Sequence, residues 1–290
     1  MPPDPQPPTL ARGTVDRAAH RRQDDDWLAA AWTDANSRVF VVDDGRSLVR
    51  DESEIVFFSP NEAPAGERFF LGVDADVAYW AVAGPLPRAL DARPLGLREI
   101  GALLDDRTAG LLVHAIALAN WHAAHTRCPR CGTPTDVTHA GHVRRCPNDG
   151  SEHFPRTDPA VIMLVHDGTE RCVLGRQPSW PPRRFSTLAG FVEPGESLEM
   201  AVVREVREEV GLHVVETSYR HSQPWPFPAS LMLGFFAEVS YDALSLDGAE
   251  LAEARWWTRD ELRSDVAAGD VLLPPPVSSA WRLINTWLDA

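Results

Sequence analysis

The stretch Gly190–Leu212 reads GFVEPGESLEMAVVREVREEVGL, and it predicts a loop that leads into a helix. The Pro-Gly pair at 194–195 is typical of a turn. Ser197 is suited to cap the N-terminus of a helix, and Gly211 is suited to end one. Between them apolar residues recur at helical spacing, which gives the helix one side for a core. The sequence therefore predicts an amphipathic helix over residues 197–210.

Three glutamates gather on the other side of this predicted helix. Glu205, Glu208 and Glu209 stand at positions i, i+3 and i+4, so their side chains are neighbours on the helix surface. Like charges so close repel each other unless a cation neutralises them. A hard divalent cation such as Mg²⁺ or Mn²⁺ prefers oxygen ligands and also binds phosphates. The spacing therefore favours a metal site that acts on a phosphorylated substrate.

The whole stretch resembles the signature of the Nudix hydrolases, G-x5-E-x7-R-E-U-x-E-E-x-G-U, in which U is an apolar residue. A surface helix rich in Glu and Arg would explain the charges, because both residues are good helix formers. It would not explain the fixed glycines of the loop or the acid at position 196. Every fixed position of the signature is met, by Gly190, Glu196, Arg204, Glu205, Val206, Glu208, Glu209, Gly211 and Leu212.

Length and composition indicate a globular protein of about two domains. The 290 residues are 44% hydrophobic and 24% charged, and the net charge is −14. This charge argues against a general binder of nucleic acids or acidic membranes. No apolar run approaches the ~20 residues of a membrane span, and the N-terminus has no signal-peptide core. We therefore expect a cytoplasmic protein without membrane contact, whose four cysteines do not form a disulfide framework.

The N-terminal part predicts a tail followed by a small domain. Residues 1–25 are rich in proline and charge and are expected to be disordered. Residues 26–125 are expected to form a mainly antiparallel β domain with helices. Residues 97–124 read as helix, in two pieces that break near positions 105–106. The expected strands are Arg38–Val42, Glu54–Phe58, Arg68–Val73 and Val77–Val82.

Residues 126–156 look like a zinc ribbon, whose ligands follow the pattern C-x2-C…C-x2-C. Cys128, Cys131 and Cys146 fit three of the four positions, and Asp149 stands where the fourth cysteine is expected. An aspartate oxygen can bind zinc, so Asp149 is the first choice of fourth ligand. Two alternatives stay open, a ribbon that holds no metal and a nitrogen ligand from His139, His142 or His153.

Residues 157–290 are expected to form the Nudix domain, which the resemblance implies is an α/β/α sandwich. The expected strands are Ala160–Val165, Arg171–Gly175, His213–Val215, Leu231–Val239 and Glu253–Trp257, with a last helix over residues 278–288.

The segment Gln223–Ser230 narrows the expected substrate. Three prolines stiffen this backbone, and they hold Trp225 and Phe227 between them. Such aromatic residues can simply fill a core. However, the motif SQPWPFPxS that begins at Ser222 resembles the marker of one Nudix branch, the NADH pyrophosphatases. The ribbon and the additional N-terminal domain are similar to that branch as well.

The resemblance implies roles for individual residues. Glu205, Glu209 and Glu250, with Glu208 and the carbonyl oxygen of Ala189, are expected to bind two or three Mg²⁺ or Mn²⁺ ions. Glu196 and Arg204 are expected to be structural. The expected contacts with the dinucleotide come from Phe154, Phe191, Gln223, Pro224, Trp225, Pro226, Phe227, Pro228, Ala229, Ser230 and Ala280, with Arg98 as a weaker match.

The implied reaction is hydrolysis of the pyrophosphate of NADH or NAD⁺ to NMN(H) and AMP. Glu209 and Glu250 are both candidates for the base that takes the proton of the attacking water. Some members of the branch also remove a nicotinamide-dinucleotide cap from RNA, and Arg144, Arg145 and Arg156 are candidates to hold that RNA. The family is typically a homodimer.

Two rival functions stay open from the sequence. The first is a pyrophosphatase of the same fold for ADP-ribose or another nucleoside diphosphate derivative, against which the segment at 223–230 argues. The second is a regulator with this fold that binds a nucleotide or RNA without catalysis. The complete set of glutamates argues against it, because binding alone does not need a repulsive acidic cluster.

Overall fold

The computed structural model describes residues 6–88, 91–246, 248 and 250–290, and the chain forms two compact units. The first unit contains residues 158–224 and 230–290, together with the described residues up to Thr9. The second contains Leu10–Thr157 and the short segment Trp225–Ala229. The segment expected to select the substrate is thus divided between the two units.

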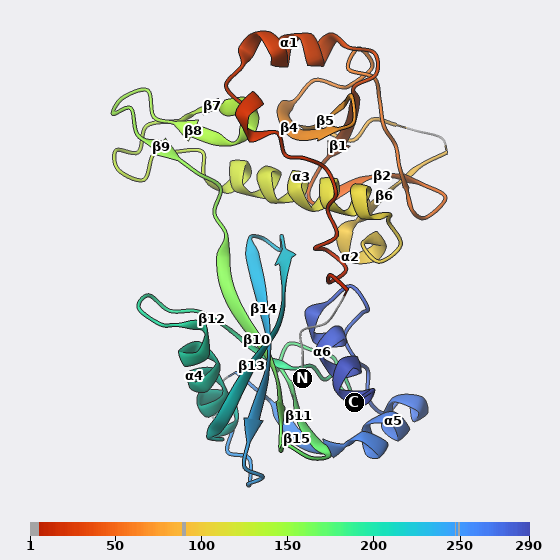
Figure 1. Cartoon of the computed structure of the whole chain (residues 1–290), viewed down its shortest axis with the longest axis vertical. Helices are drawn as coiled ribbons and strands as arrows, with labels where there is room; N and C mark the ends of the chain where they lie inside the picture. Colours follow the sequence, from red (N-terminus) through yellow and green to blue (C-terminus); the bar gives the residue numbers. More distant parts are fainter. Residues whose placement is uncertain (1–5, 89–90, 247, 249) are drawn as a thin grey trace. The chain divides into compact units, whose positions relative to one another are not determined.

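A six-stranded mixed sheet organises the first unit (Figure 1). The order along it is β13-β14-β10-β11-β15, and β12 also pairs with β10. β10 pairs in parallel with β14 and antiparallel with β11 and β12. The strands are β10 (Asp158–His166), β11 (Arg171–Arg176), β12 (Leu188–Phe191), β13 (Val214–Trp225), β14 (Ser230–Val239) and β15 (Glu253–Thr258).

Helices cover both faces of this sheet because the buried strand β10 is apolar on both sides. Val161, Met163 and Val165 pack into one core with helix α4 (Leu198–Val210). The alternate residues of β10 pack into a second core with α5 (Arg259–Ala268) and α6 (Ser279–Leu288). Figure 1 shows α4 on one side of the sheet and α6 on the other. The unit is therefore the expected α/β/α sandwich.

The helix expected over residues 197–210 is α4, and both of its ends have the predicted caps. The side chain of Ser197 accepts a hydrogen bond from the backbone N–H of Met200 at 3.2 Å. Gly211 has φ 74°, a left-handed conformation that costs glycine little and other residues more. These caps fix where the helix begins and ends, and so fix the direction of its glutamates.

The second unit begins with two small sheets and four helices. One sheet has the order β1-β5-β4, and the other has the order β3-β2-β6. The elements are η1 (Ala19–Arg21), α1 (Asp25–Thr33), β1 (Arg38–Val42), β2 (Arg46–Arg50), β3 (Glu54–Ile55), β4 (Glu67–Asp74), β5 (Val77–Ala83), β6 (Arg93–Gly96), α2 (Leu97–Ile100) and α3 (Asp106–Ala124).

The sheet β1-β5-β4 lies between α1 and α3 (Figure 1). On the α1 side, Trp27 meets Phe70 edge-on with 5.3 Å between ring centroids. On the α3 side, His122 stacks on Phe69 at 4.9 Å. Adjacent residues of one strand thus point to opposite helices, as the alternation of a strand requires.

The ribbon completes the second unit. It consists of β7 (Asp136–Thr138), η2 (His139–Gly141), β8 (Val143–Arg145) and β9 (Glu152–His153), paired antiparallel in the order β7-β8-β9. Two buried side chains bind it to the rest of the unit. His142 shares a hydrogen bond with the carbonyl oxygen of Phe70 at 2.7 Å, and His122 shares one with that of Gly141 at 2.8 Å.

Several expectations for these elements were wrong. Residues 6–25 are not disordered, because Leu10 is 1% exposed and Asp16 pairs with Val73 through backbone hydrogen bonds of 2.8 and 3.1 Å. The first five residues lie outside the described part of the chain. The β domain is mainly antiparallel, but β1 and β5 are parallel. The sequence did not predict strands β2 and β6 or helix α5. Strand β3 is shorter than expected, and strand β13 is longer.

Within the described residues, no helix has the length and apolar character needed to cross a membrane.

Candidate active site

Three carboxylates meet beside helix α4. One oxygen each from Glu205, Glu209 and Glu250 lies within 4.8 Å of the others. Glu205 and Glu209 are 6% and 5% exposed, whereas Glu250 is open to solvent. Burial raises the pKa of Glu205, and the carboxylates of Glu250 and Glu208 raise it further, although Arg204 opposes them. Two buried carboxylates and a third so close to them are unfavourable until a cation shares the charge.

Gly190 allows the closest approach at this site. A Cβ added to Gly190 would lie 1.9 Å from the carboxylate carbon of Glu205. The strand β12 can therefore run directly past the acidic cluster only because position 190 has no side chain. In the same strand Ala189, the residue before Gly190, lies opposite Ile162 of β10.

Arg204 connects the loop to the helix. Its guanidinium donates to Glu196 at 2.6 and 2.9 Å and to the carbonyl oxygen of Phe191 at 2.9 Å. The same group donates to Glu205 at 2.7 Å and Glu208 at 3.0 Å. The hydrogen bonds from Arg204 lower the pKa of Glu196 to about 2. Arg204 therefore holds both the loop and Glu205 in place, which fits the structural role expected for it and for Glu196.

Glu208 lies apart from Glu205 and Glu209, the other two glutamates of the predicted helix face. Its side chain is more than half exposed and pairs with Arg204 on the outer side of α4. Among the described residues the compact cluster contains Glu205, Glu209 and Glu250 without Glu208. Ligation by Glu208 therefore stays a prediction.

The donor set fits a hard divalent cation. All three side chains offer carboxylate oxygen, which Mg²⁺ and Mn²⁺ prefer over nitrogen and sulfur. The glycine at position 190 leaves room against the backbone, and Arg204 fixes Glu205 from one side. The residues present therefore suit the metal that the sequence predicts.

The aromatic segment is packed within the second unit. Trp225 and Phe227 meet edge-on, with 4.8 Å between ring centroids. The guanidinium of Arg98 lies 4.2 Å from the centroid of Phe227 and 5.2 Å from that of Trp225. Arg98 thus contacts the segment expected to bind the dinucleotide.

Asn120 is a residue that the sequence analysis missed. Its side-chain amide donates to the carbonyl oxygens of Pro226 at 2.9 Å and Pro228 at 3.1 Å. One side chain of α3 therefore fixes two backbone positions of the segment. The signal in the sequence is weak, since it is a single polar residue within an apolar helix, and its partners are more than 100 positions away.

The other expected substrate contacts fall into two groups. Phe154 and Phe191 are 65% and 60% exposed, which is unusual for phenylalanine and leaves both rings open to a ligand. Gln223 and Ala280 are buried, and Gln223 donates its amide to the carbonyl oxygen of Val277 at 3.1 Å. The side chain of Gln223 therefore lies inside the first unit and is not exposed to solvent.

The four expected ligands of the ribbon come together. Cys128, Cys131, Cys146 and Asp149 each place one atom within 4.8 Å of the others. The Sγ atoms of Cys131 and Cys146 are 3.5 Å apart, and Sγ of Cys128 is 3.6 Å from a carboxylate oxygen of Asp149. Three sulfurs and one carboxylate oxygen form a donor set that suits tetrahedral Zn²⁺.

The histidines considered as alternatives have other contacts. His142 bonds to Phe70 and His153 lies 3.1 Å from the hydroxyl of Ser151. None of the three histidines is part of the four-residue cluster found among the described residues. Asp149 is therefore the fourth donor that the geometry favours.

One of the arginines expected to hold RNA is buried. Arg144 is 7% exposed, and its guanidinium donates to the hydroxyl and carbonyl oxygens of Thr135 and contacts Nδ1 of His122 at 2.8 Å. It supports the ribbon from inside, so the expectation that it holds RNA was wrong. Arg145 and Arg156 are exposed.

Three family models match the chain in succession. The NADH pyrophosphatase-like rudimentary NUDIX domain matches residues 36–121, the NADH pyrophosphatase zinc ribbon domain matches 123–154, and the NUDIX domain matches 156–274.

Similar proteins cover nearly the whole chain. The "NAD-capped RNA hydrolase NudC" of Mycobacterium bovis (strain BCG / Pasteur 1173P2) is 44% identical over 301 residues, which span 97% of this chain and 94% of that protein. The protein of the same name from Mycobacterium tuberculosis (strain ATCC 25618 / H37Rv) is 43% identical over the same shares. The human "NAD-capped RNA hydrolase NUDT12" is 38% identical over 64% of this chain and 43% of its own length.

Among solved structures, a NUDIX hydrolase from Nitrosomonas europaea covers 56% of this chain and 88% of its own, with a TM-score of 0.42 and 20% identity. Fold and acidic site together define a hydrolase of the Nudix class. The chain belongs to the Nudix family, in the branch that carries the NADH pyrophosphatase zinc ribbon.

Proposed function

We propose that this enzyme hydrolyses the pyrophosphate bond of NADH and NAD⁺, and of the NAD cap at the 5′ end of RNA. The observation that carries the proposal is the cluster of Glu205, Glu209 and Glu250, whose carboxylates lie within 4.8 Å of one another. The names of the relatives that match 97% of the chain support the choice of substrate.

In the proposed reaction Glu205, Glu209 and Glu250 hold Mg²⁺ or Mn²⁺, with Glu208 and the carbonyl oxygen of Ala189 as further ligands. When bound, these ions supply positive charge that neutralises the diphosphate and lowers the pKa of a water. Glu209 or Glu250 takes the proton of that water. The water oxygen forms a bond to one phosphorus, the bridging P–O bond breaks, and NMN(H) and AMP leave.

The two ends of the dinucleotide are proposed to be recognised by aromatic residues. The exposed rings of Phe154 and Phe191 are available for stacking on a base, and such stacking contributes ~1–3 kcal/mol per base. Arg98 contacts the rings of Trp225 and Phe227, and the amide of Asn120 donates to the carbonyl oxygens of Pro226 and Pro228. This firm support favours selection of the substrate by the segment rather than by the metal ligands, which meet only the diphosphate.

We propose that the ribbon binds one Zn²⁺ through Cys128, Cys131, Cys146 and Asp149, for which their donor atoms are suited. From the resemblance to the branch, we also propose that the enzyme is a homodimer and that it is cytoplasmic. Light scattering on the purified protein measures its oligomeric state.

A turnover assay separates the proposed function from its rival. One preparation is given NADH, NAD⁺, NAD-capped RNA and ADP-ribose at matched concentration with Mg²⁺ or Mn²⁺, and the products are resolved by chromatography. The proposal predicts release of AMP from the first two substrates and of 5′-monophosphate RNA from the third. Preference for ADP-ribose over all NAD-type substrates would favour the rival pyrophosphatase.

A further inference from the structure

The ribbon packs onto the rest of the second unit at one corner, which consists of the short turn η2 and His142 after it, residues 139–142. Within this ribbon corner, Gly141 has φ 96°, and a Cβ added to it would lie 2.6 Å from the ring of Phe69 in β4. The same ring stacks on His122 of α3, with 4.9 Å between ring centroids. The ribbon, the sheet and helix α3 therefore meet at close range around Phe69.

Two imidazoles hold the ribbon corner, and the first of them, His122, can do so only as a neutral ring. Its Nε2 lies 2.8 Å from the carbonyl oxygen of Gly141, so this nitrogen must donate. Its Nδ1 lies 2.8 Å from a guanidinium nitrogen of Arg144, which is always a donor, so Nδ1 must accept. A proton on Nδ1 would place two donors and two positive charges opposite each other. The two hydrogen bonds of His122 therefore require the uncharged ring.

The second imidazole, His142, belongs to the ribbon itself. It is buried, and its Nε2 lies 2.7 Å from the carbonyl oxygen of Phe70 in β4. Its ring centroid lies 5.2 Å from that of His114, a buried residue of α3. The charges of Arg17 and Arg22 act on both of these rings. A proton on His142 would therefore add positive charge to a buried site that already faces two guanidinium groups.

The surroundings of both rings oppose their protonation. Burial, together with the two arginines and His122, lowers the pKa of His142 to about 4 against its backbone hydrogen bond. Burial also lowers the pKa of His122, and Arg144 adds to this effect. The carbonyl of Gly141 and the carboxylate of Glu67, 4.0 Å from Nδ1, act on His122 in the opposite direction. The docked ribbon thus favours neutral rings, whereas a ring exposed to water has the ordinary pKa of about 6.5.

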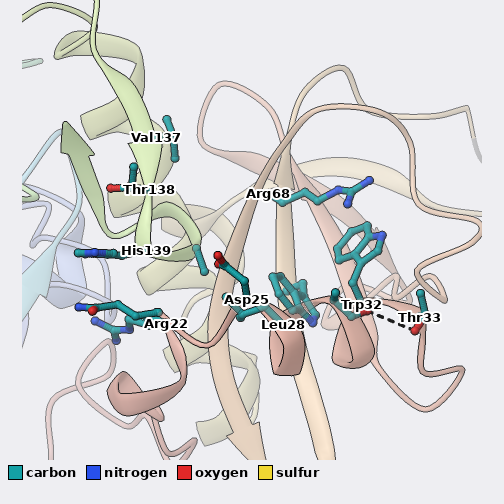
Figure 2. A pocket seen from close by; sticks show the side chains of 13 residues that line it. Arg22, Asp25, Leu28, Trp32, Thr33, Arg68, Val137, Thr138 and His139 are labelled. Carbon is teal, nitrogen blue, oxygen red and sulfur yellow. Dashed lines mark hydrogen bonds between the residues drawn. The ribbon is translucent and has the colours of Figure 1, made fainter. Parts of the chain in front are cut away.

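We propose that the ribbon corner is an acid-sensitive latch, which stays docked while His122 and His142 are neutral and opens when they take up protons. The neutral rings stabilise docking fully above pH ~6.5, and this stabilisation is lost as the pH falls from there toward the lower pKa of the docked rings. Opening also needs space. A cavity of about 740 Å³ borders the corner, and Figure 2 shows His139 among the side chains that line it.

An open ribbon would change the strand beside the corner. Strand β8 pairs with β9 through Arg144 opposite His153, and Phe154 follows His153 directly. Phe154 is one of the exposed rings to which we assign stacking on a base. Acid would thus displace a ring that binds substrate; this consequence rests on the proposed function, whereas the latch itself does not.

Hydrogen–deuterium exchange of the full-length protein at about pH 7.5 and about pH 5.5 tests the latch, in peptides that cover residues 136–145. The test variant is His142→Gln, whose amide can donate to the carbonyl of Phe70 but takes up no proton in this range. The matched control is His20→Gln, which removes an exposed histidine of the same unit. Proteins are compared at the same pH, so that the intrinsic effect of pH on exchange and any shared loss of metal from the ribbon cancel.

We expect the ratio of exchange rates, wild type over His142→Gln, to rise about tenfold from the higher to the lower pH. The reason is that one proton taken up on opening shifts the equilibrium about tenfold for each pH unit below 6.5. The control should follow the wild type at both pH values. A ratio that does not change with pH would overturn the proposal, whatever the activity of the protein on NADH.

A titration of the wild type by NMR gives a second measurement, which stands even if the variant folds poorly. The imidazole signal of His142 is followed as the pH is lowered. We expect this ring to titrate well below its ordinary pKa of about 6.5, and the ribbon to lose its protection from exchange over the same range. Titration near pH ~6.5 in a ribbon that stays protected would overturn the latch.

Discussion

Replacing Gly190 by alanine adds one methyl group directly against the buried carboxylate of Glu205. The added Cβ would lie 1.9 Å from the carboxylate carbon, whereas ordinary van der Waals contact begins near 3.4 Å. The carboxylate must therefore retreat by about 1.5 Å, because Gly190 belongs to the paired strand β12 and cannot move easily. Position 190 does not need a positive φ, so alanine fits the backbone and the effect is a steric one on Glu205.

A displacement of about 1 Å at a reacting centre can lower a rate by about 10²-fold. We expect Gly190→Ala to lower kcat on NADH by at least this factor, while overpacking costs about 1–3 kcal/mol of stability. Gly13→Ala is the matched control, because its Cβ would meet only an ordinary contact at 3.4 Å. Steady-state kinetics and thermal unfolding measure the two effects. Activity of Gly190→Ala within about twofold of the wild type would refute the close approach as a requirement for catalysis.

Three further predictions concern single side chains. Glu209→Gln should lower turnover by orders of magnitude with the fold retained, because it removes a charged metal ligand. Glu199→Gln, on the exposed first turn of α4, should change turnover little. Steady-state assays compare the two variants, and equal rates would refute the assignment of Glu209 as a metal ligand. Asp149→Ala should release the one zinc per chain that we expect in the ribbon. Metal analysis of protein purified without chelators measures this, and wild-type protein that contains no zinc would contradict the proposed zinc site. Asn120→Ala should lower the preference for NADH over ADP-ribose by roughly tenfold, because two hydrogen bonds of about 1 kcal/mol each to the segment at 223–230 are lost. An equal loss of activity on both substrates would show that this segment has a structural role and does not select the substrate.

Local signals made the centre of the Nudix unit predictable. The N-cap Ser197, the C-terminal Gly211 and the helical spacing between them all act within a few residues, and α4 forms where they place it. The glutamates of one helix face were predictable for the same reason, because a helix fixes the direction of residues three and four apart.

Contacts between distant residues could not be predicted in this way. The strand β1 is apolar at four successive positions, so its pattern does not reveal that it pairs in parallel with β5. The proline-rich start looked disordered because composition does not show that Leu10 is buried or that Asp16 pairs with the distant Val73. Likewise, Arg204 pairs with both Glu205 and Glu208, yet only Glu205 lies in the acidic cluster, and the spacing of the glutamates does not reveal this difference.

The most direct test of the central claim is the release of AMP from NADH by the purified full-length protein. We expect AMP and NMNH in equal amounts with Mg²⁺ or Mn²⁺, their loss on chelation, recovery when the metal is restored, and little product from Glu209→Gln. AMP release that persists in EDTA, or that is unchanged in Glu209→Gln, would contradict the assignment of the acidic cluster on α4 as the catalytic centre.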